Sequence, residues 1–260
     1  MEPALSGKCR VSMRKHAIVP LFSDGLAASR SYMRQTPGTV YTVALLVPAL
    51  AMAAALWAGL KPTEMLWDPI MAAGGEPSEF YLGLFSNLGV VLWTAAAAIC
   101  LFAASEVTAG TDRRARRFLL YAGLFTLLLM LDDLFMLHEN YIDHVFYILY
   151  GMGLLYYVIR FFGLIVRLDV VLFALTIPLF GNAVLLDLAP WRLLPGEGIE
   201  VPDAVAPSPV EKDAVRQFGR ELRYLLEDGF KFIGICCWAA FHIRAAKLLR
   251  QRGAPDAGIA

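Results

Sequence analysis

Long apolar runs dominate the chain, and short polar segments separate them. About 20 consecutive apolar residues are enough to cross the roughly 30 Å hydrocarbon core of a bilayer as a helix. Runs of this kind cover residues 40–60, 81–104, 118–137, 145–166, 170–186 and about 225–246. The pattern predicts an all-α, polytopic integral membrane bundle with six transmembrane helices, of which 170–186 is the shortest.

Residues 187–219 are rich in proline and glycine, which predicts an extended outer loop before the last span. Near its end, Ser208, Pro209 and Glu211 match a capping box with proline at the first helical position. The apolar positions that follow recur at helical spacing opposite basic ones. We therefore expect an interfacial helix that begins at Pro209 and bends into the last span near Gly219 or Gly229.

The amino-acid composition supports this division of the chain into apolar spans and polar segments. Hydrophobic residues make up 58% and charged residues only 18%, too apolar a balance for a soluble globular domain. The polar character is concentrated at the ends and in the loops. We expect a basic cytoplasmic tail over residues 1–38, a six-helix membrane domain over 39–248 and a second cytoplasmic tail over 249–260.

The net charge of zero conceals a strong asymmetry between the two sides of the membrane. Segments on the side of both termini hold 16 basic and six acidic residues, whereas the other side holds seven basic and 17 acidic ones. Basic loops stay in the cytoplasm during insertion. We expect both termini of this cell-membrane protein to be cytoplasmic and its partner to be the lipid bilayer, with no nucleic acid and a protein partner left open.

Two groups of polar residues lie at the outer ends of apolar runs. The third run closes with Asp132, Asp133, His138, Glu139, Asp143 and His144, and the last run opens with Glu227, Asp228 and Lys231. A charge at bilayer depth requires a partner, a cavity or an ion. Helical phasing predicts that the two groups converge on one pocket facing the extracytoplasmic side.

The residue types in this pocket indicate metal chemistry. Clustered carboxylates cannot all ionise at low dielectric without a compensating cation, and a mixed histidine and carboxylate set suits zinc, manganese or iron. The expected ligands are Asp133, His138, Glu139, Asp143 and His144. Asp132, Glu227 or Asp228 would then serve as general base, while Lys231 would stabilise an oxyanion.

The leading functional hypothesis is a metal-dependent hydrolase of a lipid or lipid-linked substrate. Two other classes fit the same residues: a proton- or cation-coupled transporter or channel, and a non-catalytic subunit or sensor that binds a metal, a lipid or a protein partner. A purely structural interpretation also stands. Charged groups at the end of a span can mark the water interface, and Glu227 and Lys231 can form an ion pair that fixes the last helix.

Overall fold

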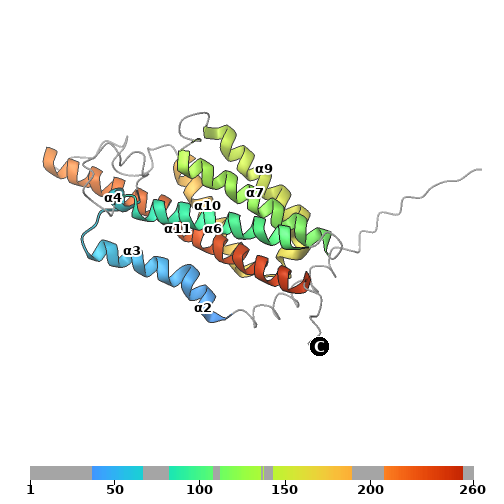
Figure 1. Ribbon diagram of the computed structural model, residues 1–260. Helices are drawn as coiled ribbons and strands as arrows, with labels where there is room; N and C mark the ends of the chain where they lie inside the picture. Colours follow the sequence, from blue (N-terminus) through green and yellow to red (C-terminus); the bar gives the residue numbers. More distant parts are fainter. Residues whose placement is uncertain are drawn as a thin grey trace, which may run out of the picture.

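All regular secondary structure in the described residues is helical (Figure 1). The computed structural model describes residues 37–66, 82–107, 112–135, 137, 143–188 and 208–253. The elements are α2 (Gly38–Tyr41), the π-helical segment η1 (Thr42–Leu46), α3 (Val47–Trp57), α4 (Pro62–Met65), α6 (Leu84–Glu106), α7 (Arg113–Phe135), α9 (Asp143–Ile165), α10 (Val170–Leu188) and α11 (Pro209–Gly253).

Six of these helical stretches are long and apolar enough to cross a membrane, as in a multi-pass membrane protein. The first consists of α2, η1 and α3 in continuous succession, and the others are α6, α7, α9, α10 and α11. Their bounds agree with the predicted spans to within a few residues, except that the last helix starts much earlier. The predicted number of spans and the all-α class are thus confirmed as a fold.

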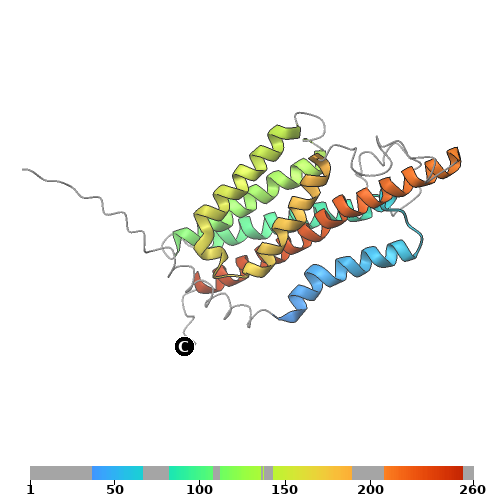
Figure 2. The ribbon, with the colours of Figure 1, turned by 180° about the vertical axis from the view of Figure 1, so that it is seen from behind.

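Successive long helices run in alternating directions (Figures 1 and 2). The two ends of the bundle differ in the charged residues that they carry. We call the end where α7 finishes and α9 begins the acidic end, and the opposite end the basic end. The start of α2 and the finish of α11 both lie at the basic end. Helix α11 lies near the middle of the bundle, with α3 on one side and α9 on the other.

Helix α11 begins where the capping pattern predicts. The Ser208 N–H donates to Glu211 Oε2 at 3.0 Å, and the Glu211 N–H donates to Ser208 Oγ at 3.2 Å. The helix then continues for 45 residues, about 68 Å at 1.5 Å per residue. It passes Gly219 and Gly229 without a break, so the expected bend into the last span is absent. Met52 packs so tightly on Gly229 that an added Cβ would lie 2.7 Å from its Cε.

The first span contains a proline that changes its hydrogen bonding. Pro48 has no N–H, so the Ala44 carbonyl loses its donor one turn later. Residues Thr42–Leu46 wind as a π-helix at this point, and Cys237 Sγ lies 3.9 Å from the Ala44 oxygen. The Cys237 thiol thus supplies a weak donor to a carbonyl that the proline releases. Cys236 and Cys237 are both buried and free.

Small side chains bring α6 and α7 into close contact. Ala96, Ala97, Cys100, Ala103 and Ala104 are buried on α6, and Ala115, Ala122 and Gly123 are buried on α7. Small residues let two backbones approach closely, which is the main source of helix association in an apolar solvent. At Gly123 an added Cβ would lie 2.7 Å from Leu101 Cγ and 3.2 Å from the Ala97 carbonyl oxygen.

Replacing Gly123 with leucine should therefore separate α6 from α7 and lower the unfolding temperature in detergent by more than about 5 °C. Gly151 on α9 is the matched control, because no atom lies within 4 Å of its added Cβ. Circular dichroism during heating measures both variants. Equal melting of Gly123→Leu and Gly151→Leu would contradict the close α6–α7 contact.

Candidate functional site

An ion pair between α7 and α11 is the centre of the acidic end. Lys231 Nζ lies 2.7 Å from Asp133 Oδ1, and the indole N–H of Trp93 on α6 donates to Asp133 Oδ2 at 2.7 Å. Both carboxylate oxygens of Asp133 are therefore engaged. Asp133 is 14% exposed and Lys231 32%, so the lysine is the more accessible partner. An ammonium group has three donors, so Lys231 can contact further acceptors besides Asp133.

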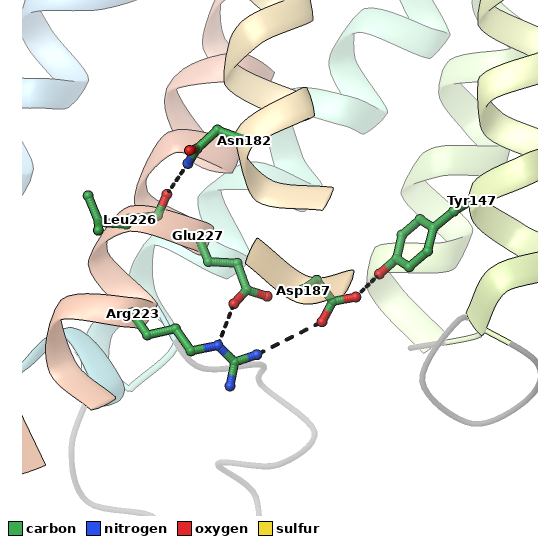
Figure 3. A network of polar contacts seen from close by, with 6 residues as sticks. All are labelled: Tyr147, Asn182, Asp187, Arg223, Leu226 and Glu227. Carbon is green, nitrogen blue, oxygen red and sulfur yellow. Dashed lines mark hydrogen bonds and ion pairs between the residues drawn. The ribbon is translucent and has the colours of Figure 1, made fainter. Parts of the chain in front are cut away.

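A second set of contacts joins α9, α10 and α11 (Figure 3). The Tyr147 hydroxyl donates to Asp187, whose other oxygen lies 3.9 Å from the Arg223 guanidinium. Arg223 Nε also donates to Glu227 Oε2 at 2.9 Å, one turn along the same helix. One turn deeper, the Asn182 side-chain amide donates to the Leu226 carbonyl at 2.9 Å. Asp187 thus links the neighbouring helices on both sides of α10.

Asp132 is the most deeply placed acid of this end, with 5% exposure. The Tyr150 hydroxyl on α9 lies beside it, and Asp133 is the next charged neighbour of that hydroxyl. Tyr147 and Tyr150 are three residues apart and share one face of α9. This face therefore contacts the acids of α7 and of α10 together.

We call this whole set of interacting side chains the polar network. It comprises Trp93, Asp132, Asp133, Tyr147, Tyr150, Asp187, Arg223, Glu227 and Lys231, from five helices. Its carboxylates outnumber its two cations, Arg223 and Lys231. Because like charges repel strongly when partly desolvated, the network favours a bound proton or another cation over full ionisation.

A dense aromatic layer lies on the basic side of the polar network. Trp238, Tyr157, Phe118 and Phe241 are fully buried there, and Trp238 contacts Trp93 edge-on with ring centroids 6.1 Å apart. The layer begins two turns beyond Lys231 along α11, about 11 Å at 1.5 Å per residue. Close-packed aromatic rings leave little room for water, so they separate the polar network from the basic end.

His242 belongs to this layer and not to the network. Its Nδ1–H donates to the Trp238 carbonyl, and its Nε2 accepts from the Tyr157 hydroxyl, each at 2.9 Å. A carbonyl oxygen cannot donate, so the tautomer follows from the first contact. With both nitrogens engaged and no exposure, His242 is a neutral core residue.

The structure brings several of the predicted site residues together. Asp132, Asp133, Glu227 and Lys231 all lie in the polar network, as helical phasing predicts, and Asp228 lies half-buried beside Glu227 on α11. Trp93 and Lys231 each contact one carboxylate oxygen of Asp133. Glu227 likewise has one oxygen on Arg223.

The other four predicted metal ligands are not placed. His138 and Glu139 lie outside the described residues, and the described part of α9 gives no side-chain position for Asp143 or His144. Within the described residues there is no group of three or more histidine, cysteine, aspartate or glutamate side chains able to hold a metal ion. The metal set therefore stays a prediction from the sequence.

Five members of the polar network were not expected from the sequence: Trp93, Tyr147, Tyr150, Asp187 and Arg223. Arg223, Glu227 and Lys231 recur every four residues, and this spacing was a usable signal for Arg223. From the sequence alone, Arg223 belongs to the basic face opposite the apolar stripe of the helix that begins at Pro209. The aromatic partners gave no such signal, because an aromatic residue in an apolar span ordinarily packs against lipid or core.

Comparison with known proteins identifies a family but no activity. Residues 40–245 match the family described as Domain of unknown function (DUF8692), and the chain belongs to this family. No curated protein and no solved structure shows a significant match. The matched region spans every long helix, including all members of the polar network.

A double-mutant cycle should show strong coupling between Asp133 and Lys231. Lys231→Met leaves a largely buried carboxylate without its partner and should cost about 2 kcal/mol of unfolding free energy, which Asp133→Asn in the same chain restores in part. The exposed pair Asp213 and Arg216, 3.2 Å apart, is the matched control and should couple by less than about 0.5 kcal/mol. Equal coupling in both cycles, measured by denaturation in mixed micelles, would contradict the central role of the Asp133 pair.

Proposed function

We propose that this member of the family acts on a lipid or lipid-linked substrate at the polar network, which faces the extracytoplasmic side of the cell membrane. The observation that carries the proposal is the one-sided position of the network. An acid-rich set of side chains lies at one end of the bundle, and the aromatic layer with Trp238 and Tyr157 closes it toward the other end. This arrangement suits a site that works from one leaflet.

The chemistry that we propose is metal-dependent hydrolysis, and the contacts in the polar network refine the role of each site residue. Asp133, paired with Lys231 at 2.7 Å and hydrogen-bonded to Trp93, would orient the lysine. Lys231 would stabilise a developing oxyanion. Asp132, held beside Tyr150, is the preferred general base. The metal ligands would come from His138, Glu139, Asp143 and His144, which follow directly on α7 and open α9.

The same geometry gives less support to a transporter. A coupled transporter needs polar groups or water along the whole crossing. On the side of the network toward the basic end, the polar atoms of Thr126, Trp238 and His242 are all hydrogen-bonded within the aromatic layer. The non-catalytic alternative has a specific observation in its favour, since ion pairs and hydrogen bonds already engage Asp133, Asp187, Arg223 and Glu227. Such a network also serves as a rigid scaffold for a subunit or sensor.

The metal content of the purified protein tests the hydrolase proposal. After reconstitution with zinc, manganese or iron, we expect about one equivalent per chain. The His138→Ala, His144→Ala double variant should lose it, whereas Asp213→Ala on the exposed face of α11 should keep it. Proteoliposomes of a total lipid extract should also release a lipid-derived product, detected by mass spectrometry, and Asp132→Asn should lower its rate at least about 100-fold.

Wild-type protein that binds no stoichiometric metal would refute metal-dependent hydrolysis. Metal binding without product release would instead favour the subunit or sensor alternative. Proton or cation flux in proteoliposomes, abolished by Asp132→Asn, would favour transport. The three classes therefore give three different sets of results.

Fusion reporters test the proposed orientation. Both termini should be cytoplasmic, because the basic end carries the excess of arginine and lysine. Green fluorescent protein fused after Ala260 should fluoresce, while alkaline phosphatase at the same place should be inactive. The reverse result is expected for fusions within residues 189–207, between α10 and α11. Active phosphatase at Ala260 would place the polar network in the cytoplasm and overturn the orientation.

A further inference from the structure

Three arginines lie together at the basic end, on the two neighbouring helices α7 and α9. Arg114 and Arg117 are exposed near the start of α7, and Arg160 is exposed near the finish of α9. The Arg114 guanidinium reaches across to α9, where it lies 3.5 Å from the position of an added Cβ on Gly163. Arg160 is three residues before Gly163, within one helical turn. Arg114 therefore reaches α9 within one turn of Arg160.

The acids near these arginines are largely engaged elsewhere. Asp112 accepts the backbone N–H groups of Arg114 and Ala115 through Oδ1, at 2.9 and 3.0 Å. Asp169 is 2% exposed and contacts Tyr41 and Arg244. Glu106 is exposed at the finish of α6. Within the described residues, none of the three arginines forms a salt bridge. The Arg160 guanidinium lies over the Phe161 ring, 5.5 Å from its centroid, and the seam keeps an excess of positive charge.

Toward the middle of the bundle, the same two helices become apolar. Leu120 and Leu124 are 43% and 53% exposed on α7, and Met152 is 58% exposed on α9. Between these levels Tyr121 and Tyr156 pack with ring centroids 5.3 Å apart, and the Tyr121 hydroxyl donates to the Gly153 carbonyl. Along the seam, the cations are followed by the tyrosine pair and then by the apolar surface. The headgroup, glycerol region and acyl chains of a phospholipid follow one another in the same order.

We propose that the α7–α9 seam at the basic end binds an anionic phospholipid, whose phosphate contacts Arg114 and Arg160 while its acyl chains lie along the exposed leucines of α7. Guanidinium groups bind phosphate oxygens in a bidentate manner and are weakly hydrated, which suits them to this level of the membrane. Basic sites between transmembrane helices bind anionic lipid headgroups in this way. The proposal is independent of any reaction at the polar network.

Native mass spectrometry of the full chain in detergent provides the test. Phosphatidylglycerol and phosphatidylcholine with identical acyl chains are titrated separately, together with inorganic phosphate alone. Wild type should bind phosphatidylglycerol at least about tenfold more tightly than phosphatidylcholine. The Arg114→Gln, Arg160→Gln double variant should lose that preference, and inorganic phosphate should bind to neither protein.

The matched control is Arg116→Gln, Arg250→Gln, which removes the same charge from exposed positions at the same end but outside the seam. This control should keep the wild-type preference. A single Arg160→Gln variant, which changes one exposed side chain, should show a smaller loss and covers the case in which the double variant does not fold. If the control and the seam variant lose the preference for phosphatidylglycerol equally, the preference arises from general charge attraction, and the proposed site is wrong. Tight binding of inorganic phosphate would overturn the lipid assignment.

Discussion

The pairing of charged groups away from water is the constraint on which this bundle depends. Charged and hydrogen-bonding groups in an apolar environment must find partners within the protein. Here those partners come from distant parts of the sequence. Asp133 meets Trp93 and Lys231 at the acidic end, and Asp169 meets Tyr41 and Arg244 at the basic end. Together with the close packing of small side chains, these contacts determine which helices become neighbours.

The two ends differ in how completely they neutralise their charge, and the aromatic layer keeps them apart. At the acidic end carboxylates exceed cations even after every described contact is formed, whereas the basic end presents arginines without acidic partners along one seam. A surplus of either sign attracts a ligand of the opposite sign. The acidic end is thus suited to a cation and to polar chemistry, and the basic end to phosphate. The two surpluses lie at opposite ends of the bundle.

Hydropathy was sufficient to predict the long apolar helices. A run of about 20 apolar residues in a membrane must satisfy its backbone hydrogen bonds internally, which favours a helix. Hydropathy did not show that the last apolar run and the helix that begins at Pro209 form one unbroken helix, since the charged residues from Lys212 to Arg223 lower the local hydropathy. Helical phasing correctly brought Lys231 toward Asp133. It could not predict Trp93, Tyr147 or Asp187, because periodicity within one helix does not specify how that helix is rotated against its neighbours. Pairing across helices is fixed only by packing.

One consequence follows from the uninterrupted course of α11. This single helix contacts Thr63 through Glu221, Asp187 through Arg223, Asp133 through Lys231, Tyr157 through His242 and Asp169 through Arg244. A helix held at so many levels cannot slide by a turn or rotate by one residue without breaking contacts at both ends of the bundle together. Its axial register is therefore over-determined. Through these contacts α11 sets the heights of α7, α9 and α10 independently of one another.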